Sequence, residues 1–264
     1  MGLPVRVLLI SDIHGNADAL KTILESSGKW DYLWILGDLV DYGPEPHIVV
    51  DLIKSMKPDL VISGNHDYAV AYGVDCKCAQ DLHELSVYTR FNISMKLLSR
   101  EQISWLKTLP HKIELKVSGK RVYVVHGSPR SPLYGYLKPN LSYDELIQQL
   151  TPQPLGVKPV EADVVITGHT HIPLNMRIGN IWLLNPGSCG QPRDGDPRAS
   201  YAVLDIENNL YEQHRIKYDI DKVLLKLRNL NIEQIYFEWL KAILKQGRVY
   251  EKVDIIQGKD QFND

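Results

Sequence analysis

Val5 to Asn16 read VRVLLISDIHGN, an apolar run that passes directly into two polar side chains, Asp12 and His14. A continuous apolar run of this kind is typical of a parallel strand that is buried on both faces. Helical spacing follows from Ala17 to Leu24, and a second apolar run, YLWILG, begins at Tyr32. This order of strand, helix and strand predicts a parallel sheet with right-handed crossovers.

The same alternation continues along the chain. Pro46 opens a second predicted helix, and DLVISG over 59–64 predicts a third strand. Residues 68–109 predict a mostly helical insertion beside the end of this strand, and residues 112–127 predict a hairpin. Several short apolar runs between 163 and 216 favour the strands of a second sheet. The chain is therefore expected to be an α/β protein.

Length and spacing predict the domain organisation. The 264 residues suffice for one domain of ordinary size with a full core. We assign residues 1–218 to this domain, with the insertion at 68–109 as part of it. Helical spacing from residue 219 onwards predicts that residues 219–264 form a C-terminal helical extension packed on the domain.

Composition argues against several classes of protein. A net charge of −2 gives no positive surface for sequence-independent nucleic-acid binding, so nucleic acid is not an expected partner. No apolar run approaches the roughly 18 residues of a membrane helix, and the apolar start is interpreted as a strand, not a signal peptide. Three cysteines cannot build a disulfide framework, so we expect a cytoplasmic protein with reduced thiols. Metal binding by the C-x-C pair Cys76 and Cys78 stays an alternative.

Five predicted strand ends carry side chains of the metal-ligand type. They are Asp12 and His14; Asp38 and Asp41; Asn65, His66 and Asp67; His126; and His169 and His171. Each residue alone has a plain structural explanation, as a helix cap, a turn residue or a hydrogen-bonded histidine. Their joint occurrence favours a single site, because open α/β sheets bind ligands beyond the carboxyl ends of their strands.

The chemistry and spacing of these residues favour a pair of metal ions. Residues two apart in an extended chain point the same way, so we expect Asp12 with His14, and His169 with His171, to face one cleft. Carboxylate, amide and imidazole ligands without thiolate suit Mn²⁺, Fe, Zn²⁺ or similar ions. Seven ligands of this kind, taken from the ten side chains named above, are too many for one ion. If one carboxylate is shared between two ions, the seven ligands can hold both.

Taken in order, the motifs D-x-H, G-D, G-N-H-D, H-G and G-H-T-H resemble those of the calcineurin-like metallophosphoesterase superfamily. The resemblance spans Val5 to Ile206, and the loops HGSPRSPLYGYL and NPGSCGQPRDGDPRASY resemble those of its small prokaryotic phosphodiesterases and phosphatases. It implies a four-layer α/β/β/α sandwich of two mixed sheets flanked by helices. It also implies two divalent metal ions, with Mn favoured over Fe, Zn or Ni.

The resemblance also implies roles for individual residues. The implied ligands are Asp12, His14, Asp38 and His171 for one ion, with Asp38 bridging to a second ion held by Asn65, His126 and His169. His66 is implied as the catalytic histidine, and Asp41 as the residue that orients it. Tyr42 stands where the protein-phosphatase branch has an arginine, which argues against that branch.

The expected reaction is hydrolysis of phosphomono- or phosphodiesters by a hydroxide that bridges the two ions. A small phosphorylated substrate, with nucleotides among the candidates, is the expected partner, and homo-oligomerisation is left open. Three arginines follow strands that carry candidate ligands and could bind phosphate: Arg193, Arg130 and Arg198. Arg193 is the preferred candidate. The alternative for each is a salt bridge on the surface. A metal-binding scaffold that recruits partners and a nuclease are the alternative functions.

Overall fold

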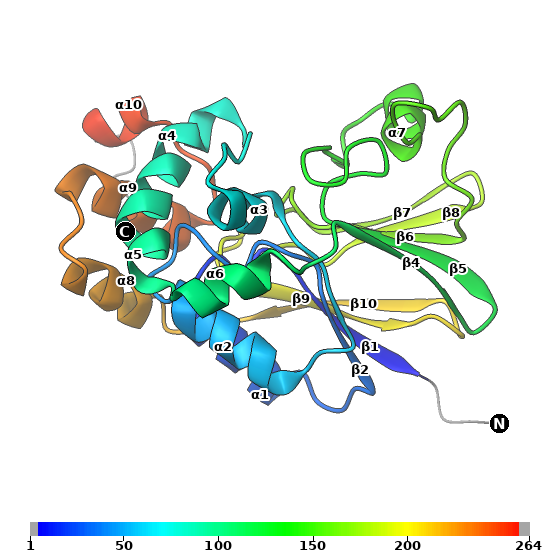
Figure 1. Ribbon diagram of the computed structural model, residues 1–264, viewed down its shortest axis with the longest axis horizontal. Coiled ribbons are helices and arrows are strands. Elements are labelled where there is room, and N and C mark those ends of the chain that lie inside the picture. The colour runs from blue at the N-terminus through cyan, green and yellow to red at the C-terminus, as the bar shows by residue number, and fades with distance from the viewer. Residues whose placement is uncertain (1–4, 259–264) are drawn as a thin grey trace.

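The computed structural model describes residues 5–258, in which two five-stranded sheets pack face to face (Figure 1). The first sheet has the strand order β10-β9-β1-β2-β3. Its strands are β1 (Arg6–Ile10), β2 (Tyr32–Ile35), β3 (Leu60–Val61), β9 (Ala199–Asp205) and β10 (Leu210–Ile216). As predicted, β1, β2 and β3 run parallel, whereas β9 and β10 are antiparallel to their neighbours.

The second sheet has the strand order β4-β5-β6-β8-β7. Its strands are β4 (Lys112–Val117), β5 (Lys120–Val125), β6 (Val164–Ile166), β7 (Leu174–Ile178) and β8 (Ile181–Asn185). β4 and β5 form the predicted hairpin, β6 lies parallel to β5 and β8, and β7 closes the sheet antiparallel to β8. Both sheets are therefore mixed.

The expectation that the strands between 163 and 216 share a second sheet is wrong for the last two. β9 and β10 return to the first sheet, where Val203 of β9 pairs with Leu8 of β1. β1 lies in the middle of this sheet and needs a partner on each side to satisfy its backbone N–H and C=O groups. An apolar run identifies a buried strand but carries no information about which strand pairs with it.

Alternate residues of β1 enter two different cores, which explains its continuous apolar run. Val7 and Leu9 pack against the second sheet, whereas Leu8 and Ile10 pack against α1 (Ala17–Ser26) and α2 (Pro46–Met56). On the other side of the molecule, α7 (Tyr143–Leu150) packs against the outer face of the second sheet. The predicted four-layer sandwich is thus confirmed (Figure 1).

Helices gather beyond one end of the sheets (Figure 1). The insertion contains α3 (Asn65–Tyr72), α4 (Gln80–Thr89), the π-helix η1 (Arg90–Ser94), α5 (Met95–Leu97) and α6 (Arg100–Leu106). It is mostly helical as predicted, but its first helix begins earlier, at Asn65.

The C-terminal segment packs on this insertion. It contains α8 (Ile220–Asn229), α9 (Gln234–Gln246) and α10 (Lys252–Ile256), which share one apolar cluster with α4 and η1. We call α4, η1 and α8–α10 the helical cap. Residues 259–264 of the predicted extension lie outside the described residues. Across residues 5–258, no helix has the length and apolar character needed to cross a membrane.

Candidate metal centre

The segments that follow β1, β2, β3, β5 and β6 bring their polar side chains together. All of the side chains singled out at the predicted strand ends are buried: Asp12, His14, Asp38, Asp41, Asn65, His66, Asp67, His126, His169 and His171. Ligand-type atoms from four of these segments lie within 4.8 Å of one another in two groups. The convergence that the sequence predicted is therefore present in the fold.

The backbone at these positions is left-handed, not extended. The φ angle is 51° at Asp12, 47° at His14, 66° at His169 and 59° at His171. The expectation that an extended chain aligns each pair is wrong, although both pairs still enter the same site. A left-handed residue costs roughly 1–2 kcal/mol, so surrounding contacts must hold it. The His14 amide, for example, donates to the Asp38 carbonyl at 2.9 Å.

The Asp38 loop is also held from the other side. The Asp67 carboxylate accepts hydrogen bonds at 2.8 Å from the backbone amides of Asp38 and Leu39, and at 2.9 Å from Gly64. The Asp38 Oδ1 atom accepts a hydrogen bond from the His66 amide at 2.9 Å. These bonds fix the Asp38 side chain against the start of α3 and leave Oδ2 for another partner.

The first group contains Asp12, His14, Asp38 and His171. The Nδ1 atoms of His14 and His171 lie 2.9 Å and 2.6 Å from the backbone carbonyls of Val40 and Gln191. Because a carbonyl only accepts, each Nδ1 carries the proton and each Nε2 carries a lone pair. The two Nε2 atoms lie only 3.1 Å apart. Two lone pairs at this distance repel each other unless a cation or a proton lies between them.

The second group contains Asp38, His126 and His169. Asn65 begins α3 and precedes His66, whose amide donates to Asp38. His126 Nδ1 donates to the Leu36 carbonyl at 2.7 Å, and Asn65 Nδ2 donates to the Cys76 carbonyl at 2.9 Å. His126 Nε2 and Asn65 Oδ1 take no part in these two hydrogen bonds.

Two buried atoms here, Asn65 Oδ1 and His169 Nε2, have no hydrogen-bond partner within the described residues. His126 Nε2 and Asp38 Oδ2 lie 3.2 Å apart and have each other as their near polar neighbour. An unsatisfied buried polar atom costs roughly 1–3 kcal/mol. A divalent cation fits this donor set, and Asp38 belongs to both groups.

Burial sets the protonation of the imidazoles in the first group. It lowers the pKa of His14 to about 3 and that of His171 well below its ordinary value, so both rings are neutral at pH 7. Burial also raises the pKa of Asp12 to about 6. Asp38 behaves differently: burial would raise its pKa, but the neighbouring His126 and His66 hold it well below its ordinary value.

His66 lies beside the two groups and has partners of its own. Its Nδ1 atom donates to Asp41 Oδ2 at 2.9 Å, and both side chains are buried. Burial would lower the pKa of His66, but the Asp38 charge and the Asp41 hydrogen bond raise it to about 9. The imidazole is therefore protonated on both nitrogens, and so positively charged, at neutral pH.

Arg90 is a functional candidate that the sequence did not reveal. It opens η1, is buried, and donates from Nε to Asp41 Oδ2 at 3.2 Å. Its Nη1 donates to the Val74 carbonyl at 3.1 Å. No motif surrounds Arg90, although π-helices are frequent at functional sites.

Of the three candidate arginines, Arg193 contacts Tyr42 and Gln191, which in turn contact His14 and His171. Its guanidinium lies 5.8 Å from the Tyr42 ring centroid, and Nη2 donates to Gln191 Oε1 at 2.7 Å. Arg198 donates twice to the adjacent Asp196 carboxylate, as in the salt-bridge alternative. Arg130 lies in the segment after β5, where its backbone amide donates to the Gln149 carbonyl.

Comparison with known proteins agrees with this geometry. Residues 5–209 match the model of the calcineurin-like phosphoesterase superfamily domain. Uncharacterized protein MJ0912 from Methanocaldococcus jannaschii is 32% identical over 262 residues, covering 92% of this chain and 98% of that protein. Phosphodiesterase YfcE from Escherichia coli is 26% identical over 205 residues, covering 76% of this chain and 88% of YfcE. The crystal structure of a metallophosphoesterase from Sphaerobacter thermophilus superposes with a TM-score of 0.74 at 28% identity, covering 93% of this chain and all of that one.

Proposed function

Because the chain belongs to the calcineurin-like phosphoesterase superfamily and is a phosphoester hydrolase, we propose that it hydrolyses small phosphomono- or phosphodiesters at a dinuclear metal centre. The observation that carries this proposal is the presence of two buried groups of ligand-type atoms that share Asp38, with Asn65 Oδ1 and His169 Nε2 buried and without hydrogen-bond partners among the described residues. The similarity to a protein named as a phosphodiesterase supports the ester class. Nucleotides are among the candidate substrates.

The ligand assignment follows the two groups. One ion would be held by Asp12, His14, Asp38 and His171, and the other by Asp38, Asn65, His126 and His169. Asp38 would be the bridging ligand, since it alone belongs to both groups. Nitrogen and oxygen ligands without sulfur suit Mn²⁺, which we favour over Fe, Zn²⁺ and Ni²⁺.

Two divalent cations held there would supply Lewis acidity and the positive charge that attracts phosphate. The chain's own carboxylates leave that charge only partly neutralised, because Asp12 and Asp38 are the only acidic residues in the two groups. Asp12 also accepts a hydrogen bond from the His169 amide at 3.1 Å, which fixes its carboxylate within the centre. The chain thus prepares a buried, positively charged site for a phosphoryl group.

His66 is positioned to give a proton to the leaving oxygen of the ester. Its raised pKa keeps the imidazole protonated, and the Asp41 hydrogen bond at Nδ1 directs Nε2 away from Asp41. Arg90 in turn holds Asp41 through Oδ2. We assign His66 as the general acid and Asp41 and Arg90 as positioning residues. General acid catalysis contributes roughly 10²–10⁴-fold in rate.

Arg193 is the candidate for holding a phosphoryl oxygen of the substrate. Its Nε atom is buried and has no hydrogen-bond partner within residues 5–258, so a donor remains available. The Arg193 charge acts on the metal centre, since it helps burial to lower the pKa of His171. A planar guanidinium suits phosphate oxygens.

The scaffold alternative receives no support from these contacts. A protein that only recruits partners would not need a buried His66 aligned by Asp41 and Arg90. A nuclease is disfavoured by the net charge of −2. The three free cysteines fit a reducing compartment, so we place the protein in the cytoplasm.

The test is to purify the protein, measure bound metals, and assay it with Mn²⁺ added. The panel contains p-nitrophenyl phosphate, bis-p-nitrophenyl phosphate, cyclic nucleotides and dinucleoside polyphosphates. We expect two metal ions per chain and hydrolysis of at least one ester. Two bound ions without hydrolysis of any ester would instead support the scaffold.

A further inference from the structure

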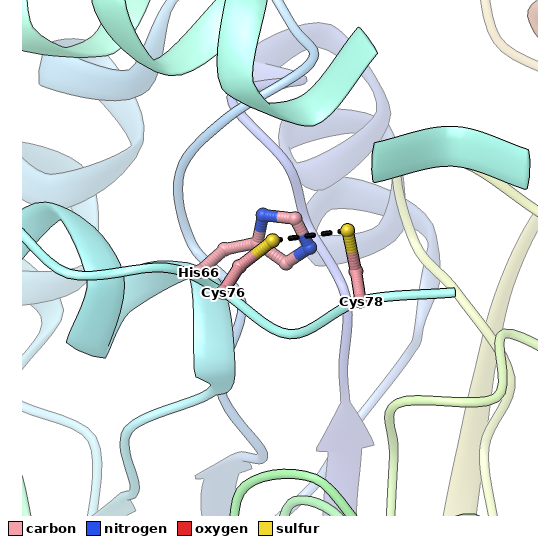
Figure 2. Close-up of side chains that lie close together, drawn as sticks. All are labelled: His66, Cys76 and Cys78. Atoms are coloured by element: carbon pink, nitrogen blue, oxygen red, sulfur yellow. Dashed lines mark hydrogen bonds between the residues drawn. The ribbon is translucent and has the colours of Figure 1, made fainter. Parts of the chain in front are cut away.

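Two cysteines lie beside the imidazole of His66, outside the two ligand groups of the metal centre (Figure 2). Cys76 and Cys78 belong to the loop between α3 and α4, and their sulfur atoms lie 2.9 Å apart. Neither forms a disulfide in the described chain. One ligand atom from each of His66, Cys76 and Cys78 lies within 4.8 Å of the other two. Sequence alone left metal binding by this pair open.

The spacing of these three atoms suits a single metal ion. Sulfur and nitrogen atoms bound to one zinc lie about 2.3 Å and 2.0 Å from it, so two ligands of the same ion are at most about 4.6 Å apart. His66 Nδ1 lies 2.9 Å from Asp41 Oδ2, so Nε2 is the nitrogen that we assign to the cation. Figure 2 shows the imidazole lying next to both sulfur atoms. A small movement of the loop would therefore complete the three-ligand set.

The surroundings of Cys76 favour a thiolate. Ser86 Oγ lies 3.2 Å from Cys76 Sγ, and Arg90 Nη2 donates to the same hydroxyl at 3.2 Å. Thiolates, not thiols, are metal ligands.

The loop also offers a further ligand. Asp75, Cys76 and His83 form another group within 4.8 Å, in which Asp75 Oδ2 lies 2.7 Å from His83 Nε2. Asp75 is exposed and His83 is partly exposed, so both can move toward Cys76. Structural zinc is usually four-coordinate, and a carboxylate or a second imidazole would complete the set.

We propose that Cys76, Cys78 and His66 form a third metal site for a thiophilic divalent cation such as Zn²⁺, and that its occupation switches hydrolysis off. The binding part stands on the contacts of this loop alone, whereas the inhibitory part rests on the proposed function of His66. A cation on Nε2 takes the position of the proton that His66 would give to the substrate. It also pulls on the loop whose Cys76 carbonyl orients Asn65.

The binding part is tested with Co²⁺, because bound thiolate gives cobalt an intense near-ultraviolet charge-transfer band. The dinuclear centre contains no sulfur, so this band reports the third site alone. Metal-free wild type titrated with Co²⁺ should develop the band and bind three ions per chain. The Cys76→Ser/Cys78→Ser variant should bind two and lack the band. Cys189→Ser, which changes the third free cysteine, is the matched control and should keep it.

Two single variants guard against misfolding of the double variant. Cys78 is only partly buried, so Cys78→Ser should fold and keep about half of the band intensity, with one thiolate remaining. His66→Ala should keep both thiolates but weaken the binding of the third ion at least tenfold. Absence of the band in wild type, or its persistence in the double variant, would overturn the site. Unchanged affinity in His66→Ala would remove the imidazole from it.

The inhibitory part is tested by adding micromolar Zn²⁺ to the Mn²⁺-loaded enzyme. We expect at least a tenfold loss of hydrolysis in wild type and in Cys189→Ser, and little loss in the double cysteine variant. Equal inhibition of all three would overturn the regulatory role while the cobalt band still decides binding. If no variant hydrolyses any ester, the proposed function fails, and the cobalt result remains independent of it.

Discussion

The metal centre and the helical cap are both buried, but by opposite physical means. The centre buries carboxylates and imidazoles, which are costly to bury unless they are hydrogen-bonded or bind an ion. The cap buries large apolar side chains such as Trp239, Leu240 and Ile243, each of which stabilises the fold by roughly 1.5–3 kcal/mol. The centre therefore needs a ligand for its stability, whereas the cap is stable through its own packing.

Tyr42 is the residue at which the two regions meet. It belongs to the apolar cluster of the cap, and its ring centroid lies 4.9 Å from that of His14 and 5.1 Å from that of His66. Arg90 makes a second connection, since it comes from η1 and donates to Asp41. The comparison teaches that loops at the strand ends position the proposed metal ligands, whereas the cap helps to orient His66.

The largest expected effect follows from Asp38→Asn. This change removes the carboxylate shared by both ligand groups, so kcat/KM should fall at least on the order of 10³-fold. Metal analysis should find fewer than two ions per chain. Asp205→Asn, at the end of β9, is the control, because Asp205 is a buried carboxylate that bonds to Asn208 and belongs to neither ligand group. An Asp38→Asn enzyme that still held two ions would disprove the bridge.

His66→Asn separates metal binding from proton transfer. We expect kcat to fall roughly 10²–10⁴-fold, because the general acid is lost while the ligand atoms remain in place. The Mn²⁺ content of the Mn²⁺-loaded enzyme, measured by elemental analysis, should stay at two ions per chain, because His66 belongs to neither group that contains Asp38. His214→Asn provides a matched control, since His214 stacks on Tyr201. Near-normal turnover in His66→Asn would exclude the assigned role, and loss of one of the two Mn²⁺ ions would make His66 a ligand of the dinuclear centre.

Ile243→Ala tests whether the helical cap is stabilised by its own apolar packing. Ile243 is fully buried in the cap, so its truncation should lower the free energy of unfolding by about 2–5 kcal/mol. Metal content and kcat should stay near wild type.

Removing the metal ions with a chelator should independently lower the free energy of unfolding of wild type, by about 2.7 kcal/mol if the ions were present at 100 times their Kd. Denaturant unfolding should find the two effects additive, and strong coupling between them would show that the regions are not independent.

The convergence of the candidate ligands could be predicted from sequence because these residues follow strand ends in short motifs. Asp12, His14, His169 and His171 converge as expected, although their left-handed backbone was not foreseen. Strand ends meet at one edge of a sheet whatever the local angles are, so the convergence did not depend on the wrong detail.

The contacts from the cap could not be predicted in the same way. Arg90 reaches Asp41 from a helix 49 residues further along the chain, and the Cys76 carbonyl holds Asn65 from a loop. Such contacts depend on how helices pack, and helical periodicity gives the buried face of a helix but not its neighbour. The pairing of β9 with β1 was missed for the same reason.

The smallest expected effect concerns the ion pairs that join the cap to the sandwich. Asp18 of α1 lies 2.8 Å from Lys222 of α8 and also pairs with Lys226. Burial would raise the pKa of Asp18, but these hydrogen bonds hold it below its ordinary value of 3.8. A carboxylate with a lowered pKa stabilises the fold above its ordinary pKa, and this contribution disappears as the pH falls through the folded-state value. Asp18→Asn should therefore lower the free energy of unfolding by only about 0.5–1 kcal/mol at pH 7, because solvent screens the pair.

The difference in unfolding free energy between Asp18→Asn and wild type should shrink below about pH 3.8 and at high salt. A double-mutant cycle with Lys226→Met, measured by denaturant unfolding, isolates the pair from the effect of Asp18 on the start of α1. A coupling energy of zero at pH 7 and low salt would mean that apolar packing alone holds the cap in place.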